Sequence, residues 1–287
     1  MKVAEWQDFS VIATGNGYKL ERWGKVILLR PDPQVIWEDT FGMDKYKGLS
    51  AKYIRSSTGG GKWQTFGKMP DEWKISYKDL TFKIKPMGFK HTGLFPEQAV
   101  NWDLTRSLVE KANRPINVLN LFAYTGGATV ALAKSGANVC HVDSAKAMVE
   151  RAGENARLSG VDNTKIRYII DDCKKFVQRE IKRGKRYDAI IMDPPSYGRG
   201  PNGEMWKIET ELYSLVNLCA EVLSQNPLFF LINSYTTGLQ PQVIKNILQK
   251  TIANKIGGKV DAYEVGLKTE EKGIVLPCGN SGIWINE

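Results

Sequence analysis

Asn120-Leu121-Phe122-Ala123-Tyr124-Thr125-Gly126-Gly127-Ala128-Thr129 is the stretch that says most about how this chain of 287 residues folds. It continues from a short apolar run, residues 117–121, and leads into a segment of small residues, 127–134, that is typical of a helix. The two adjacent glycines allow the backbone to turn tightly and to approach a ligand beside the first amide groups of that helix. The pattern predicts a strand, a glycine turn and a helix whose N-terminus faces a binding site, although two glycines can also serve a turn alone.

The alternation of strand and helix continues along the rest of the chain. Each short apolar run that predicts a strand is followed by a segment that predicts a helix. The later strands are expected at residues 138–142, 165–170, 187–192 and 228–232, the helices at 145–159, 173–183, 207–223 and 242–254, and closing strands at 274–276 and 282–285. This order predicts an α/β fold, a Rossmann-like doubly wound parallel sheet with helices on both faces.

The first part of the chain has a different pattern. Short strands are expected at residues 18–23, 25–30, 75–77 and 81–85, separated by glycine and proline turns. The change near residue 86 predicts two domains: a small β-rich domain over residues 1–86 and the α/β domain over residues 87–287.

The net charge of +9 is concentrated in the first third of the chain, and this favours an anionic partner such as nucleic acid. Between Asp44 and Lys68 the sequence has six basic residues and one acidic residue, interleaved with aromatic residues. Cations bind phosphates and aromatic rings stack on bases, so this segment is expected to bind a nucleic acid, unless it is simply a solvated basic surface. The candidate substrate-binding residues are Lys45, Lys52, Arg55, Trp63 and, in a later glycine-rich loop, Arg199. A second basic cluster at residues 182–186 is interpreted as the end of a helix.

Composition excludes several other classes. The apolar fraction of 42% and the charged fraction of 25% are those of a globular protein, and no run of about 20 apolar residues that could cross a bilayer is present. The first residues lack the apolar core of a secretory signal, so a reduced, cytoplasmic protein is expected. Four scattered cysteines and two histidines predict neither a disulfide framework nor a metal site.

The residues that follow the predicted strands carry the candidate chemistry, because doubly wound sheets bind ligands at the carboxyl ends of their strands. Asp143 follows the second strand and is suited to accept both hydroxyls of a ribose, or it caps a helix that Ser144 is equally placed to cap. After the third strand, Asp172 is favoured for the amine of an adenine, and Asp171 for the helix cap. The fourth strand ends in Asp193-Pro194-Pro195-Ser196-Tyr197. There the Asp193 carboxylate and the Pro194 carbonyl are expected to face a substrate as acceptors, with the Tyr197 ring stacked on a base.

This set of motifs resembles class I S-adenosylmethionine-dependent methyltransferases, in particular the group that resembles large-subunit (23S) ribosomal RNA methyltransferases. The resemblance is carried by residues 91–98 (HTGLFPEQ), 120–127 (NLFAYTGG), 141–144 (HVDS) and 193–197 (DPPSY). It implies S-adenosylmethionine as cofactor, RNA as substrate and no metal. The cofactor-binding residues that it implies are Gln98, Asn120, Phe122, Tyr124, Thr125, Gly126, Asp143, Ser144, Asp172, Cys173 and Asp193, and the catalytic residues are Asp193, Pro194 and Tyr197. Relatives have Arg after the glutamine, whereas this chain has Ala99.

The acceptor atom is expected to be a base nitrogen. Methylation at carbon 5 of a pyrimidine needs a cysteine nucleophile, which such enzymes carry in the Asp-Pro-Pro turn or just after the fifth strand. In this chain those positions hold Ser196 and residues 233–236, and none of them is a cysteine. An oxygen acceptor stays open. The alternatives are a methyltransferase of a protein or small molecule, a non-catalytic RNA-binding module on this fold, and a nicotinamide-dependent oxidoreductase, which the glycine pattern disfavours.

Overall fold

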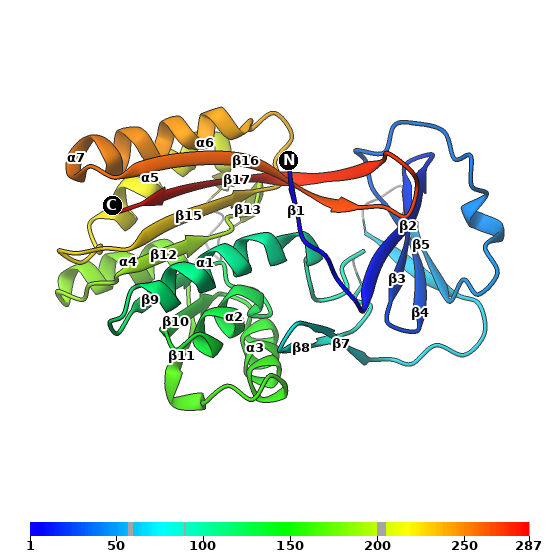
Figure 1. Cartoon of the computed structure of the whole chain (residues 1–287), viewed down its shortest axis with the longest axis horizontal. Coiled ribbons are helices and arrows are strands. Elements are labelled where there is room, and N and C mark those ends of the chain that lie inside the picture. Colours follow the sequence, from blue (N-terminus) through cyan, green and yellow to red (C-terminus); the bar gives the residue numbers. More distant parts are fainter. Residues whose placement is uncertain (57–59, 89, 200–204, 287) are drawn as a thin grey trace. The chain divides into compact units, whose positions relative to one another are not determined.

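The computed structural model describes residues 1–56, 60–88, 90–199 and 205–286. The chain forms two compact units (Figure 1). The first contains Met1–Val100 and Gly266–Cys278, and the second contains Asn101–Val265 and Gly279–Glu287. The first unit therefore extends beyond residue 86, and it also includes residues 266–278, because two long strands near the C-terminus contribute residues to both units.

The first unit is rich in β-structure, as the sequence predicts. Its main sheet has the order β2 (Phe9–Gly15), β3 (Tyr18–Trp23), β4 (Val26–Pro31), β5 (Ala51–Arg55) and β6 (Gly61–Thr65). A separate hairpin joins β7 (Trp73–Tyr77) to β8 (Leu80–Ile84), and β1 (Lys2–Val3), η1 (Met43–Lys45) and η2 (Pro96–Gln98) are short. Apolar side chains such as Leu20 and Leu29 pack into one cluster of this unit.

Two cations of this unit are internal. Arg30 donates from Nε and Nη2 to the carboxylate of Glu21, over 2.6 and 2.8 Å, and Glu21 is fully buried. Lys19 lies 3.1 Å from Asp32. Burial opposes the charge of Glu21, but Arg30 and Lys19 outweigh burial and lower the pKa of its carboxyl. The positive charge of the first third is therefore not all available to a partner.

The second unit contains the predicted doubly wound sheet. Its parallel strands are β9 (Asn117–Leu121), β10 (Asn138–Asp143), β11 (Ile166–Ile170), β12 (Ala189–Met192) and β15 (Phe229–Ser234). The order across the sheet is β11-β10-β9-β12-β15-β17-β16-β1, where β17 (Val275–Ile285) is antiparallel to β15 and β16 (Lys259–Lys268) follows it. The strand order reverses between β9 and β12, and this is where such sheets bind their ligands.

Helices cover both faces of this sheet (Figure 1). On one face α4 (Cys173–Lys182), α5 (Ile208–Ala220) and α6 (Pro241–Leu248) share a single apolar core with the strands. The other face carries α2 (Gly127–Lys134) and α3 (Lys146–Leu158), with α1 (Ala99–Lys111) drawn beside them. After α6 the helix widens into a π-turn (η4, Gln249–Ala253) and ends in α7 (Asn254–Ile256), and η3 (Asn163–Lys165) precedes β11.

Within the described ranges, no helix is both long and apolar enough to cross a membrane. The same residues contain no group of three His, Cys, Asp or Glu side chains arranged to hold a metal ion.

Candidate functional site

The loop after β9 has an unusual backbone. Phe122 and Tyr124 have positive φ angles of 54° and 49°, although neither is glycine. Such conformations cost about 1 kcal/mol or more each and occur often at functional sites, where the surrounding structure holds them. Here the Phe122 N–H donates to Sγ of Cys173 over 3.3 Å and the Tyr124 N–H donates to Oδ2 of Asp143 over 2.8 Å. The loop is therefore fixed by residues that follow β10 and β11.

The two glycines after this loop are required by packing. Gly126 has a φ of 83°, and a Cβ at that position would lie 2.7 Å from Cβ of Ala152 in α3. A Cβ on Gly127 would lie 2.6 Å from the ring of Trp102 in α1. The glycines thus let α2 begin close to its neighbours, with the amide groups of its first turn at the carboxyl end of β9. The prediction of a strand, a glycine turn and a helix is confirmed.

Asp143 ends β10 and is held by one hydrogen bond to each carboxylate oxygen. Oδ2 accepts from Tyr124, and Oδ1 accepts from the N–H of Ala145 over 2.9 Å. Each oxygen keeps a second lone pair, so the half-buried carboxylate is oriented and can still accept hydroxyl groups. Ser144, which the sequence placed where it could cap the next helix, does not cap it: Ala145 is the N-cap of α3, the helix has no side-chain cap, and Ser144 is exposed.

The helix cap after β11 is made by a different carboxylate from the one expected. Asp172, not Asp171, caps α4, because its Oδ1 accepts the N–H of Lys175 over 2.8 Å. Asp171 pairs with Arg179 and accepts the N–H of Asp172 over 2.9 Å. The cap uses one oxygen of Asp172, and its other oxygen has no hydrogen-bond partner in the described part of the chain. The predicted contact of Asp172 with an adenine stays a prediction.

Two other residues of the implied cofactor set are buried in the second unit. The Asn120 side chain donates to Oγ1 of Thr129 over 2.8 Å, and that hydroxyl also lies 2.9 Å from Nδ1 of His141. The carbonyl of Thr125 accepts a hydrogen bond from Asn155 over 2.8 Å. Both residues therefore support the loop from inside. Gln98 is also buried, but it belongs to the first unit, and its implied contact with the cofactor stays a prediction.

All four cysteines are buried and free. Burial raises the pKa of the Cys173 thiol to about 12 and that of Cys140 to about 11, and it also raises the pKa of Cys219 and Cys278. A neutral, buried thiol is a poor nucleophile. The interpretation of the cysteines as core residues agrees with this placement.

The Asp193-Pro194-Pro195 turn follows β12 and is fastened by residues far along the chain. Nε1 of Trp206 donates to the carbonyl of Pro195 over 2.6 Å. The hydroxyl of Thr236 donates to that of Ser196 over 2.6 Å. Asp193 is half-buried and Pro194 is buried. The turn is therefore a rigid element at the switch point of the sheet.

A short hairpin that the sequence did not predict follows the turn. It pairs β13 (Tyr197–Arg199) with β14 (Met205–Lys207) and places the ring of Trp206 with its centroid 6.1 Å from that of Phe122. Tyr197 is 48% exposed, so its ring is accessible for stacking. Trp206, which contacts both Pro195 and Phe122, was not predicted from the sequence, and its only signal there is a lone tryptophan in a glycine-rich segment. The side chain of Arg199 lies outside the described residues.

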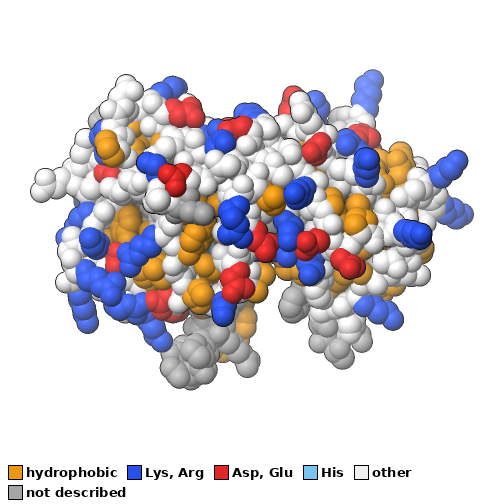
Figure 2. Space-filling view, turned by 90° about the horizontal axis from the view of Figure 1, so that it is seen from below, with side chains coloured by type: hydrophobic (Ala, Val, Ile, Leu, Met, Phe, Trp, Pro, Cys, Tyr) orange, Lys and Arg blue, Asp and Glu red, His pale blue; other side chains and the backbone are white. Residues whose placement is uncertain are grey.

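The other predicted substrate residues lie in the first unit, and they differ from one another in exposure and in their contacts within the protein. Lys45 and Arg55 are exposed. Lys52 donates to Asp44 over 2.5 Å and lies 4.9 Å from the ring of Tyr18. Trp63 is half-buried and donates its N–H to the carbonyl of Met87 over 2.8 Å. Lys52 and Trp63 are thus engaged within the protein. The face drawn in Figure 2 has Lys and Arg side chains interspersed with acidic ones.

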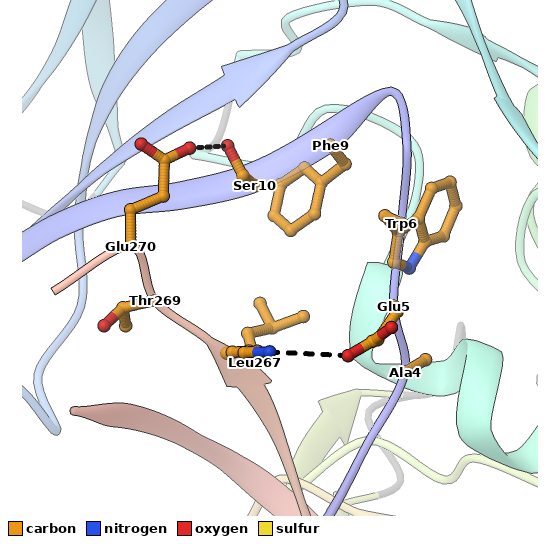
Figure 3. Close-up of a pocket in the computed structure, with 9 residues that line it drawn as sticks. Ala4, Glu5, Trp6, Phe9, Ser10, Leu267, Thr269 and Glu270 are labelled. Carbon is orange, nitrogen blue, oxygen red and sulfur yellow. Dashed lines mark hydrogen bonds and ion pairs between the residues drawn. The ribbon is translucent and has the colours of Figure 1, made fainter. Parts of the chain in front are cut away.

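The first unit also has a cavity of about 570 Å³ (Figure 3). Trp6 and Phe9 form part of its wall, Lys268 pairs with Glu5, and the hydroxyl of Ser10 donates to Glu270. The charges that line it are therefore partnered. Its lining residues include none of those predicted to bind the cofactor.

Comparison with known proteins identifies the family. Residues 37–223 match the family described as S-adenosylmethionine-dependent methyltransferase. A crystal structure of the SAM-dependent methyltransferase from Agrobacterium tumefaciens is 33% identical, covers 99% of this chain and 92% of that one, and superposes with a TM-score of 0.92.

Two curated relatives are ribosomal RNA large subunit methyltransferases. Methyltransferase K/L of Shewanella frigidimarina is 33% identical over 180 residues, which are 62% of this chain and 24% of that protein. Methyltransferase K of Neisseria meningitidis is 25% identical over 256 residues, which are 86% of this chain and 70% of that protein. The chain thus spans about a quarter of the length of the K/L relative. From these matches, together with the sheet and the strand-end residues described above, this chain belongs to the S-adenosylmethionine-dependent methyltransferase family.

Proposed function

We propose that this chain is an enzyme that transfers the methyl group of S-adenosylmethionine to a base nitrogen of RNA, with large-subunit ribosomal RNA as substrate. The observation that carries the proposal is the hydrogen bond between Tyr124 and Asp143, which fixes a strained loop and an acidic side chain together at the switch point of the sheet.

The residues at this point fit the cofactor. The carboxylate of Asp143 keeps acceptor capacity for the two hydroxyls of a ribose. The positive φ angles of Phe122 and Tyr124 shape the loop for a close ligand, and the first amides of α2 suit the carboxylate of a methionine group. When bound, the sulfonium group supplies an electrophilic methyl carbon, from which an in-line acceptor displaces the neutral thioether as leaving group.

The enzyme then has to align the acceptor and exclude water. Asp193 and the carbonyl of Pro194 are the acceptors that would hold an amino group of a base. Because Trp206 donates a hydrogen bond to the carbonyl of Pro195, the turn that carries these acceptors is held without help from the substrate. Asp193 accepts a hydrogen bond from the amine while the nitrogen lone pair attacks the methyl carbon, and the methylated nitrogen then gives up its proton to Asp193 or to water. The Tyr197 ring stacks on the base.

A nitrogen acceptor is favoured over carbon 5. The carbon-5 reaction needs a cysteine thiolate, and burial raises the pKa of Cys173, the cysteine nearest the proposed cofactor loop, to about 12. A nitrogen acceptor needs only orientation and a proton acceptor.

The RNA substrate is supported by the names of the curated relatives and by the basic first unit. Lys45 and Arg55 are exposed and suited to phosphates, whereas Lys52 and Trp63 contribute less because they are engaged elsewhere. A ribosomal RNA substrate also implies a cytoplasmic enzyme.

The test is a calorimetric titration with S-adenosylmethionine and, separately, with NAD. Binding of S-adenosylmethionine alone is expected. Transfer of labelled methyl groups should then appear in large-subunit ribosomal RNA purified from a deletion strain, and not in RNA from the parent strain. Binding without transfer to RNA would favour a protein or small-molecule substrate, and a folded protein that binds no S-adenosylmethionine would favour a non-catalytic RNA-binding module.

A further inference from the structure

The first unit has a second cavity, of about 680 Å³, that differs from the one in Figure 3 by its positive charge. Its lining includes Arg22, Lys25, Lys68 and Lys74, together with the ring of Trp73 and a single carboxylate, Asp8. The volume is within the range of pockets that hold small molecules or a few chemical groups of a larger one.

The one acidic residue of the lining cannot balance its four cations. One oxygen of Asp8 accepts the N–H of Ser76 over 2.8 Å. Among the described residues, the ammonium groups of Lys25, Lys68 and Lys74 form neither an ion pair nor a hydrogen bond, and all three residues are exposed. Asp8 supplies one negative charge against these three ammonium groups and the Arg22 guanidinium, so the lining keeps an excess of positive charge, and this favours an anionic ligand.

The aromatic residue of the cavity adds a second observation. Nε1 of Trp73 is buried and has no hydrogen-bond partner in the described structure. A buried donor without a partner costs about 1–3 kcal/mol, so such groups call for an explanation in terms of a ligand or a water. Trp73 lines the cavity, so this donor belongs to a residue that a ligand in the cavity would contact.

This tryptophan is better placed to meet a ligand than the one predicted from the sequence. The N–H of Trp63 is already bonded to the carbonyl of Met87, and its ring packs on buried Tyr53 with centroids 5.3 Å apart. The N–H of Trp73 has no such bond, and its ring lies among unpaired lysines.

We propose that the cavity around Trp73 binds single-stranded RNA, with Lys25, Lys68 and Lys74 on the phosphodiester backbone and Trp73 against one nucleotide. Cationic grooves with an aromatic platform are how single-stranded RNA is commonly held. This inference rests on the proposed function and deepens it, because it names the substrate-binding surface of the first unit.

The test measures the affinity of the full chain for a fluorescein-labelled oligouridylate by anisotropy over a series of salt concentrations. The pocket variant is Lys25→Gln/Lys74→Gln, and the matched control is Lys111→Gln/Lys250→Gln, which removes two exposed lysines from the second unit. The pocket variant should bind several-fold more weakly, and its slope of log affinity against log salt should fall by about 1.4, or about 0.7 for each lost phosphate contact. The control should keep the slope of the wild type.

A second variant, Trp73→Phe, separates a ligand role from a structural one. It keeps an aromatic ring and removes the unpartnered N–H, so the melting temperature of the free protein should stay the same or rise, while the affinity for the oligouridylate falls several-fold. If Trp73 had only a structural role, the melting temperature of the Trp73→Phe variant would fall and its affinity for the oligouridylate would stay that of the wild type.

The outcomes are distinct. If the wild type binds the oligouridylate but the pocket variant changes no more than the control, the cavity assignment fails and the RNA substrate stands. If the wild type shows no salt-dependent binding at all, both fail. Displacement by uridine monophosphate at an equal phosphate concentration would overturn the assignment to an RNA chain in favour of a free nucleotide.

Discussion

The backbone N–H of Tyr124 donates a hydrogen bond to Oδ2 of Asp143 over 2.8 Å. Tyr124 follows β9, Asp143 is the last residue of the neighbouring parallel strand β10, and Tyr124 has a φ of 49°. The carboxylate therefore holds a loop that would otherwise relax, and the loop in turn aims the carboxylate. A cofactor that uses both would find them already arranged, and this arrangement reduces the entropy lost on binding.

Replacement of Asp143 by Asn should weaken S-adenosylmethionine binding by about tenfold or more, because a charge-assisted hydrogen bond contributes about 1.5–3 kcal/mol. The Asn side chain still offers one oxygen to Tyr124, so the fold should survive. Calorimetry measures the affinity and a melting curve measures the stability. Asp162→Asn, at an exposed aspartate of the same unit, is the control; equal affinities for the two variants would remove Asp143 from the cofactor site.

Asp193→Asn should separate binding from turnover. The variant keeps the shape of the turn and loses the negative charge that holds the amine proton, so turnover should fall by about 10² or more while the affinity for S-adenosylmethionine changes little. The two measurements are calorimetry and the rate of labelled methyl transfer. Retained turnover would show that Asp193 only completes the turn.

The strand-end carboxylates could be predicted because the alternation of strand and helix is a local pattern. The limits of β9 and α2 match the predicted segments 117–121 and 127–134. Once the strands are predicted, Asp143 and Asp193 are identified as the carboxylates at the ends of two of them. The physical reason is that parallel strands buried on both faces are continuous apolar runs, and such runs are easily recognised.

The residues that sequence analysis missed depend on contacts between distant segments. Trp206 reaches Pro195 only after a hairpin has formed, and the sequence of that hairpin is rich in glycine. The cap of α4 falls to Asp172, whereas Asp171 forms an ion pair with Arg179, which lies about two helical turns further along the chain. The residues of β16 are only partly apolar, so the sequence does not predict this strand. For the same reason the sequence does not predict that residues 266–278 belong to the first unit.

Trp206→Phe should lower turnover by several-fold without changing the affinity for S-adenosylmethionine. The substitution removes the hydrogen bond to Pro195, which contributes about 1 kcal/mol to holding the turn, and it keeps a ring beside Phe122. Trp284→Phe is a matched control, because its N–H also bonds to a backbone carbonyl, that of Gly257, over 2.7 Å. A similar loss of turnover in both variants, compared well below their melting temperatures, would mean that the effect is one of general stability.

Cys173→Ser should keep turnover close to that of the wild type. A hydroxyl replaces the thiol as acceptor for the N–H of Phe122, and the thiol has no catalytic task because burial raises its pKa to about 12. The rate of labelled methyl transfer is the measurement. Loss of turnover in a variant that still binds S-adenosylmethionine would revive a cysteine adduct and a carbon acceptor.

The stability of the second unit should fall as the pH is lowered from about 6.5 to about 4, and His141 should contribute to this loss. The imidazole is fully buried against Thr129, and burial lowers its pKa from 6.5 to about 4. Between these two values the unfolded chain binds a proton that the folded chain does not, so the free energy of unfolding decreases with falling pH, by at most about 1.4 kcal/mol per pH unit for this group. His141→Gln keeps a polar partner for Thr129 and cannot titrate, so its urea-unfolding free energy, followed by tryptophan fluorescence, should depend less steeply on pH than that of the wild type. The carboxylates titrate in both proteins and cancel in the difference. Parallel curves for the two proteins over this range would mean that His141 already takes up its proton in the folded state.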